Sequence, residues 1–289
     1  MANNSRAINR VFTRGVLNDL LQSGSNEVFD YIVQRYVDDP ESKTHGEIIS
    51  EIYAHLGKEQ RNEYYYMNTL LNKLLIGIHS VNTTTALTQV RIENHIADFV
   101  TINGEGRVYE IKSDLDKFDK LCDQLRDYYK AFSKVSVLST LHEYEKVSRL
   151  LEQLGDMGEA VGIYLMNDCD IYFNRDNRRE PKEYNAYLNH GSIFKLLRKR
   201  EYENVLLVHY REIPRVAPVF HYRACFEWFE EIPLLTAQKL TLKELKKRNR
   251  ITKTDFENIQ NEIKSIVYFS TLSRKLPDIE QLLQSVYRG

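Results

Sequence analysis

The stretch "HIADFVTINGEGRVYEIKS" (95–113) decides the fold. Its two outer parts are short and rich in β-branched and aromatic residues, and the turn-forming "NGEG" (103–106) separates them, as is typical of a hairpin. A run of the same kind precedes it, so we expect a three-stranded meander. The predicted strands are 85–92, 95–102 and 107–113.

Opposite charges interrupt the last of these strands. Side chains alternate faces along a strand, so Glu110 and Lys112 share one face with Val108. A three-residue loop at Asn103-Gly104-Glu105, with one residue at positive φ, would place Asp98 directly opposite Glu110. Directly opposed Cβ atoms are about 5 Å apart. Two carboxylates and an ammonium are therefore expected to converge on one patch.

Such a patch favours metal-dependent chemistry. Two neighbouring carboxylates are costly without a cation. Mg²⁺ accepts one or two carboxylates, keeps several waters and takes phosphate oxygens as further ligands. We therefore interpret Glu110 and Lys112 less as an ion pair than as separate tools, Glu110 with Asp98 for Mg²⁺ or Mn²⁺ and Lys112 for the attacking water. That arrangement suits hydrolysis of a phosphodiester.

The segment after the charged strand returns to a helical period. "SDLDKFDKLCDQLRDYYKAF" (113–132) carries an apolar stripe, and Ser113 is its expected N-cap. Lys120, Gln124 and Tyr128 follow one another at intervals of four residues and form a separate polar stripe. We expect this stripe to overhang the charged patch.

The remaining pattern predicts an α/β fold with a mixed sheet and flanking helices. Further helices are expected at 6–22, 26–37, 47–56, 60–77, 142–155, 190–204, 237–247 and 253–268, and further strands at 134–139, 160–166 and 170–174. Residues 38–46 read as a loop, 175–185 as a boundary, and 205–235 mixes strand-like runs with prolines. We predict an N-terminal helical segment (1–59), a core (60–175) and a mostly helical C-terminal domain (176–289).

Composition limits the functional classes. The chain has 289 residues, and 40 Lys and Arg against 41 Asp and Glu give a net charge of −1. Three distant cysteines without a CxxC pair indicate reduced thiols rather than a zinc site or a disulfide framework. There is no signal-peptide pattern and no apolar run of the roughly 20 residues that span a bilayer, so we expect a cytoplasmic protein without membrane contact.

Nucleic-acid binding by such a chain needs local concentrations of positive charge. Two clusters meet this need and are candidate phosphate-contact surfaces, although a solvated helix face is the alternative for each. The first consists of Lys195, Arg198, Lys199 and Arg200; the second consists of Lys239, Lys243, Lys246, Lys247, Arg248 and Arg250.

The motif "IADFV…YEIKSD", followed by a helix with "QLRDYY", resembles the PD-(D/E)XK nuclease superfamily. Asp98, Glu110 and Lys112 match its Asp, Asp/Glu and Lys, while Gln124 and Tyr128 match the Q-x-x-x-Y helix of the RecB-like branch. The resemblance implies a restriction-endonuclease-like αβββαβ core and Mg²⁺-dependent DNA cleavage. Asp98, Glu110 and the Ile111 carbonyl would bind the metal, Gln124 and Tyr128 would brace the site or the substrate, and Lys120 would contact DNA.

The wider stretch 63–139 also resembles a group of bacterial proteins often encoded on mobile elements, and 193–206 and 240–250 resemble it more weakly. This implies a role in phage defence or mobile-element biology. A homodimer or a protein partner from a defence system is left open.

The sequence departs from the nuclease pattern in one respect. Many members carry another acid upstream; Glu63 could supply it from the leading helix, but on the first strand Gln89 stands where a Glu would be sought. An amide is a poorer ligand for a hard metal. The alternative function is therefore a catalytically impaired nuclease-fold protein that binds DNA or a protein partner.

Two further features are expected to be structural. His95 should point away from the face of Asp98, which favours a turn or packing role over metal binding. The run Tyr64–Tyr66 lies on an amphipathic helix, so core packing is favoured over stacking on bases.

Overall fold

A six-stranded mixed sheet forms the centre of the computed structural model, with strand order β1-β2-β3-β4-β5-β6. The strands are β1 (Thr85–Ile92), β2 (His95–Asn103), β3 (Glu105–Ile111), β4 (Lys134–Thr140), β5 (Gly162–Asn167) and β6 (Asp170–Tyr172). β1, β2 and β3 are antiparallel neighbours, β3, β4 and β5 are parallel, and β6 is antiparallel to β5. The predicted α/β class, meander and mixed sheet are confirmed.

The structure describes residues 5–59, 61–78, 80–113, 116–167, 170–172, 179–248 and 251–289. The N-terminal helices are α1 (Ser5–Val11), α2 (Arg14–Ser23), α3 (Glu27–Tyr36), α4 (His45–Glu59) and α5 (Glu63–Asn72), and a π-helical stretch (Lys73–Ile78) continues α5. Within the sheet region lie α6 (Leu121–Tyr128), α7 (Tyr144–Glu152) and α8 (Asp156–Ala160).

The C-terminal helices are α9 (His190–Lys195), α10 (Lys199–Tyr210), α11 (His221–Glu230), α12 (Leu234–Lys246), α13 (Lys253–Asn258), α14 (Lys264–Tyr268) and α15 (Leu276–Gln284). Short 3₁₀ turns occupy Pro40–Ser42, Leu141–Glu143, Pro218–Phe220, Asn261–Ile263 and Thr271–Arg274.

The two faces of the sheet are covered by different helices because side chains alternate along each strand. Phe99, Tyr109 and Ile111 belong to one hydrophobic cluster, together with buried residues of α1–α5 and α13–α15. Val100 and Val108, one position away, belong to a second cluster with buried residues of α6, α7 and α9–α12. The segment 176–289, predicted as one domain, therefore contributes to both faces.

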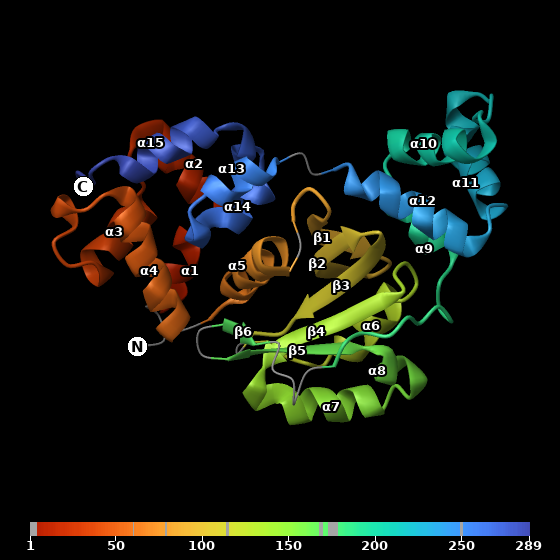
Figure 1. The fold of residues 1–289 in the computed structure, drawn as a ribbon, viewed down its shortest axis with the longest axis horizontal. Coiled ribbons are helices and arrows are strands. Elements are labelled where there is room, and N and C mark those ends of the chain that lie inside the picture. Colours follow the sequence, from red (N-terminus) through yellow and green to blue (C-terminus); the bar gives the residue numbers. More distant parts are fainter. Residues whose placement is uncertain are drawn as a thin grey trace.

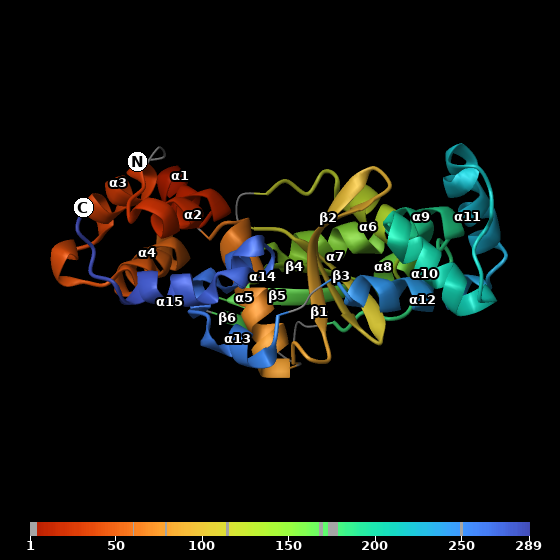
Figure 2. The same ribbon diagram turned by 90° about the horizontal axis from the view of Figure 1, so that it is seen from above.

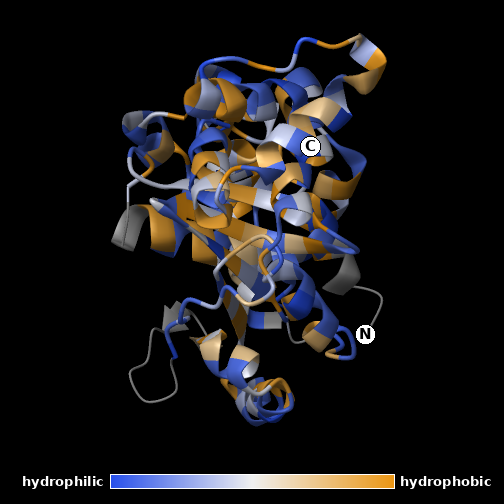
Figure 3. Ribbon diagram, turned by 90° about the vertical axis from the view of Figure 1, so that its right-hand side faces the viewer, coloured by the Kyte–Doolittle hydropathy of each residue, from blue (hydrophilic) through white to orange (hydrophobic). Residues whose placement is uncertain are grey.

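Helices at the two ends of the sheet give the molecule an elongated outline (Figures 1 and 2). α1–α4 and α15 lie side by side at one end, so the first and last parts of the chain pack together, and α9–α12 lie at the other end. Viewed from the α9–α12 end (Figure 3), hydrophobic and hydrophilic residues alternate along the helices, as expected for helices that bury one face.

Several predicted helices are interrupted. The expected helix 6–22 breaks at Thr13, whose backbone is extended and whose side chain accepts from the Val16 N–H, so that α2 starts with its own N-cap. The expected helix 190–204 breaks at Arg198, which is extended and whose N–H donates to Glu201 Oε2. The expected helix 253–268 is divided into α13 and α14 by extended residues Ile259 and Gln260.

Other predictions differ in the connections between elements. The strand-like interpretation of 205–235 is wrong, because α10 continues to Tyr210 and α11 starts at His221, and the prolines lie in the connection between them. α4 starts at His45, two residues inside the predicted loop 38–46. Residues 173–174, predicted to end a strand, lie outside the described residues.

Gly106 lets α12 pack closely on the β2–β3 hairpin, and we predict that a side chain there destabilises the fold. A Cβ on Gly106 would lie 2.6 Å from Leu242 Cδ2 and 2.7 Å from Phe132 Cδ1. Gly106→Ala is expected to lower the free energy of unfolding by about 1–3 kcal/mol, measured by urea denaturation. Gly15→Ala is the control, because its Cβ meets only Thr13 Oγ1 at 4.0 Å, and it should leave stability unchanged or slightly higher. Equal stabilities for parent and Gly106→Ala would contradict this packing.

Candidate active site

The β2–β3 hairpin has the register on which the predicted site depends. Asn103 pairs with Glu105 around Gly104, which has a φ of 74°, and the pairing continues to Phe99 with Tyr109. The next position along this register places Asp98 opposite Glu110. The backbone N–H of Ile111 donates to Asp98 Oδ2 at 2.8 Å. The hairpin therefore brings the two predicted acids to one face of the sheet.

Glu110 is the centre of a hydrogen-bonded network. Its Oε1 accepts from Lys112 Nζ at 2.7 Å and from Gln124 Nε2 at 2.5 Å, and its Oε2 accepts from the Tyr128 hydroxyl at 2.6 Å. Lys112 Nζ also donates to Gln124 Oε1 at 3.0 Å. The structure thus joins the charged strand to α6 through four of the predicted residues.

The charges of this network are buried. Glu110 is 1% exposed and Lys112 is 7% exposed. Glu110 and Lys112 form an ion pair, contrary to expectation, because Nζ and Oε1 lie within salt-bridge distance. Their separate roles toward a metal and a water stay predictions. A buried carboxylate needs a partner charge and further donors, and Lys112 on the same strand face supplies the nearest cation.

Tyr128 remains protonated in this environment. Burial, followed by the negative charge of Glu110, raises the pKa of the Tyr128 hydroxyl. The hydroxyl also lies 2.9 Å from the carbonyl oxygen of Ile96, so it is shared between an acceptor on β2 and the carboxylate on β3. Tyr128 therefore links β2 to the carboxylate on β3. Its role in supporting a catalytic site stays a prediction.

Asp98 differs from Glu110 in having few donors. Burial and the negative charge of Glu110 raise the pKa of Asp98 to about 8, against the lowering effect of the Ile111 N–H. Among the described residues none donates to the second carboxylate oxygen, Oδ1. Asp98 is therefore the acid in this site whose charge the protein compensates least.

Glu63 and Gln89, the predicted upstream positions, meet beside this patch. Gln89 Nε2 lies 3.5 Å from Glu63 Oε1. Burial, followed by the charges of Asp116 and Glu110, raises the pKa of Glu63, so its carboxylate shares the electrostatic environment of the site. Gln89 is exposed and has a φ of 53°, which interrupts the β1–β2 pairing beside Asp98. A left-handed residue in a strand is uncommon and was not foreseen.

Asp116 lies beside the site, because its charge contributes to the raised pKa of Glu63. The predicted helix start at Ser113 is wrong; instead the N–H and hydroxyl of Ser113 donate to Asp116 Oδ2 at 2.8 and 2.6 Å. These two hydrogen bonds join Ser113 to Asp116 after β3, and α6 begins only at Leu121. The intervening residues 114 and 115 lie outside the described residues.

Asp127 fixes α6 over the meander. Its Oδ2 lies 2.7 Å from His95 Nδ1 and accepts from the Asn94 N–H at 3.2 Å, and its Oδ1 accepts from Lys130 at 2.6 Å. His95 thus bonds to α6, which covers the face of Glu110, and does not point away from that face as expected. Its contact with Asp127 fits the predicted packing role. Tyr64–Tyr66 also pack as expected: Tyr65 and Tyr66 are buried, and the Tyr64 ring stacks on Phe12.

The predicted nucleic-acid contacts are only partly available. Lys120 and Lys243 are exposed, but several others already hold acidic partners. These pairs are Lys195–Glu93, Lys199–Glu203, Lys247–Glu244 and Arg248–Glu201. Arg198, Arg200 and Lys239 are exposed, Lys246 is half-buried, and Arg250 lies outside the described residues.

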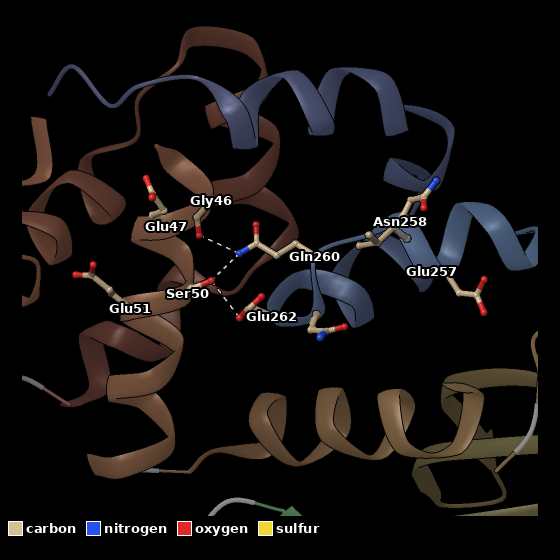
Figure 4. A pocket seen from close by; sticks show the side chains of 10 residues that line it. Gly46, Glu47, Ser50, Glu51, Glu257, Asn258, Gln260 and Glu262 are labelled. Atoms are coloured by element: carbon tan, nitrogen blue, oxygen red, sulfur yellow. Dashed lines mark hydrogen bonds between the residues drawn. The ribbon is translucent and has the colours of Figure 1, made fainter. Parts of the chain in front are cut away.

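A pocket of about 720 Å³ opens elsewhere, between α4 and the segment that links α13 to α14 (Figure 4). Gln260 Nε2 donates to the Gly46 carbonyl and to Ser50 Oγ at 2.9 Å each, which joins the N-terminal and C-terminal helices. The pocket lining is acidic and would repel a phosphate backbone. The acidic residues are Glu47, Glu51, Glu257 and Glu262.

The fold and the site define an α/β protein whose charged centre lies at one end of a β-meander. A family model described as bacteriophage P4 protein cII matches residues 57–270, which include the whole sheet and every residue of the Glu110 network. The chain therefore belongs to the bacteriophage P4 protein cII family. Neither the curated proteins nor the solved structures contain a match. None of the helices in the described part of the chain is long and apolar enough to cross a membrane.

The raised pKa of Asp98 predicts a stability that falls with pH. Between about pH 4 and pH 8 the folded chain holds a proton that the unfolded chain releases, so the free energy of unfolding decreases across this window. Asp98→Asn, which is uncharged, should remove this component and be more stable than the parent at pH 8.5, by on the order of 1–2 kcal/mol. Urea denaturation in EDTA at pH 5 and pH 8.5 measures the difference.

Glu105→Gln is the control, because the pH dependence of stability that it removes has the opposite direction to that of Asp98. Burial raises the pKa of Glu105, but the hydrogen bond from Lys134 and the Arg107 charge lower it overall. Its stabilising contribution is therefore present above its unfolded pKa and lost in acid. A pH profile that Asp98→Asn leaves unchanged would contradict the assigned pKa.

Proposed function

We propose that this protein is a Mg²⁺-dependent nuclease of the PD-(D/E)XK type that hydrolyses phosphodiester bonds in DNA. The observation that carries the proposal is the convergence of Asp98, Glu110 and Lys112 on one sheet face, with Gln124 and Tyr128 bonded to Glu110. The family match to a bacteriophage protein supports a setting in phage or mobile-element biology.

The oxygen atoms available at the site suit an Mg²⁺ ion with few protein ligands and several bound waters. Asp98 Oδ1 is free of donors from the described residues, and Glu110 Oε2 accepts one hydrogen bond and has a second lone pair. Burial, followed by the negative charge of Glu110, raises the pKa of Asp98, and a cation bound beside both carboxylates would offset this repulsion. No group of three or more His, Cys, Asp or Glu that could hold a metal occurs among the described residues, so two carboxylates, the Ile111 carbonyl and water would complete the shell.

Bound there, Mg²⁺ would act as a Lewis acid on a phosphoryl oxygen and lower the pKa of a coordinated water. Lys112 supplies the fixed positive charge. Its ammonium has three N–H groups, of which two are used by Glu110 and Gln124, so the third is available to a water or to a phosphate oxygen. Gln124 orients Lys112, because its amide oxygen accepts from Nζ while its amide nitrogen donates to Glu110.

A second candidate function is DNA or partner binding by a catalytically impaired member of the same fold. Two observations favour it. Both lone pairs of Glu110 Oε1 are occupied by Lys112 and Gln124, and Gln89 offers an amide where an acid would strengthen metal binding. The cleavage experiment decides between the two candidates.

We predict Mg²⁺-dependent cutting of linear and plasmid DNA that Asp98→Ala and Lys112→Ala each reduce by at least about 100-fold. Lys117→Ala is the matched control, because Lys117 is an exposed lysine in the same connection. Gel-based cleavage at fixed protein concentration, with Mg²⁺ or Mn²⁺ titrated, gives the rates. DNA binding by the parent without cutting under either ion would refute the nuclease and support the impaired member.

Tyr128→Phe tests the hydrogen bond that orients Glu110 separately from the cleavage step. The variant keeps the buried ring but removes the donor to Glu110 Oε2, so the carboxylate is less well oriented. We expect the Mg²⁺ concentration for half-maximal cleavage to rise about 10- to 100-fold, as for lost outer-shell contacts at other metal sites. Tyr129→Phe is the neighbouring control, because the Tyr129 hydroxyl is buried without a hydrogen-bond partner in the described chain. An unchanged Mg²⁺ requirement in Tyr128→Phe would exclude this role.

A further inference from the structure

Hydrophobic side chains are exposed together on the short turn before α11 and on its first residues. Val219 is 80% exposed and Phe220 is 60% exposed, and Tyr222 beside them is also exposed. A single exposed apolar side chain is ordinary, but a group of them marks a contact surface. We call Val219, Phe220 and Tyr222 the apolar tip. α10 and α11, which carry it, lie at the end of the molecule away from the N-terminal helices (Figure 1).

Residues next to the apolar tip contact α9 and α10. Next to Phe220, His221 Nε2 lies 2.7 Å from Glu203 Oε1 on α10. The inner side of the Tyr222 ring packs against Phe194 and Tyr202, with ring centroids 5.3 and 6.0 Å apart. Pro218 opens the turn and limits its backbone freedom. These contacts fix the backbone that carries the exposed side chains, which lowers the entropy cost of binding.

Positive charge borders the apolar tip. Lys199 reaches within 4.0 Å of the same Glu203 that contacts His221, so this exposed lysine lies beside the tip. Arg215 precedes the tip, is exposed, and forms no ion pair with a described residue. Arg223 follows it and contacts Glu227 at 2.8 Å while both side chains remain mostly exposed. Glu212 is the one acid in the connection 211–217.

We propose that the apolar tip inserts between base steps of duplex DNA, while Lys199 and Arg215 contact the phosphates on either side. Apolar wedges bordered by cations are how architectural proteins unstack and kink a duplex. An apolar protein partner would leave Arg215 without a counter-charge, and the 4.0 Å contact of the exposed Lys199 with Glu203 is a weak surface pair that a phosphate can replace. A duplex supplies phosphates next to every base step. The inference rests on the proposed function in one respect, since duplex DNA is taken as the ligand.

The experiment measures binding without cleavage, in EDTA, with a duplex of about 30 base pairs and the same duplex carrying one unpaired nucleotide. The parent should prefer the bulged duplex several-fold, because part of the unstacking cost is already met. Val219→Ser/Phe220→Ser should bind the paired duplex at least 10-fold more weakly and lose this preference. Tyr31→Ser, at a similarly exposed aromatic on α3, is the matched control and should behave as the parent.

Salt dependence separates the wedge from the phosphate contacts. Lys199→Ala/Arg215→Ala should flatten the plot of log K against log salt by about 1.8, since each phosphate contact contributes about 0.9. Val219→Ser/Phe220→Ser, the wedge variant, should keep the parent's slope of log K against log salt, because an apolar contact releases no counter-ions. A duplex labelled at both ends should show less bending by energy transfer with the wedge variant than with the parent.

Three results would overturn the proposal. The wedge variant could bind both duplexes like the parent, or the parent could bind neither duplex. Alternatively, sedimentation could show that the wedge variant loses self-association or a protein partner while its DNA affinity is unchanged. Cleavage without wedge-dependent binding would refute only this proposal, and wedge-dependent binding without cleavage would refute only the nuclease.

Discussion

The arrangement of the site depends on a carboxylate, Glu110, that the fold buries almost completely. A buried charge is tolerated only with a partner charge and enough hydrogen bonds, and removing one partner of such a pair typically costs about 3–5 kcal/mol. Lys112, the first residue after β3, supplies the charge, and α6 supplies Gln124 and Tyr128. The position of α6 is therefore determined by polar as well as apolar contacts. Asp127, bonded to His95 and Lys130, holds that helix from its other side.

The charged residues Asp98 and Glu110 lie at one end of the sheet, where the apolar residues of that face stop. Along β2 and β3, Val100 and Val108 belong to the hydrophobic cluster under α6 and α12, and the next residues on that face are Asp98 and Glu110. The opposite face remains apolar through Ile111. At the other end of the hairpin, the absence of a side chain at Gly106 leaves room for α12. α9 and α10 pack against α12, so this group of helices lies away from the charged patch.

Alternation and turn chemistry made the centre of the fold predictable from the sequence. The Asn-Gly turn set the hairpin register, and the register set which acids face each other. Non-local contacts were not predictable in this way. Nothing in the pattern around Ser113 indicates that its hydroxyl and N–H bind Asp116 rather than cap a helix, or that Gln89 has a left-handed backbone. Likewise, helical periodicity identified several C-terminal helices, but it missed α11 and α15 and did not show that α13–α15 pack with α1–α5.

The contrast between the two acids bears on how a divalent ion would bind. Glu110 is satisfied by three protein donors, whereas burial, followed by the negative charge of Glu110, raises the pKa of Asp98 to about 8. Metal binding to a protonated carboxylate must release that proton, so affinity rises with pH until the group is ionised. A divalent ion at the proposed site would therefore compete with a proton for Asp98. It would not have to displace Lys112 from Glu110. Lys112 can remain bonded to Glu110 and Gln124, holding its third N–H toward the reacting groups.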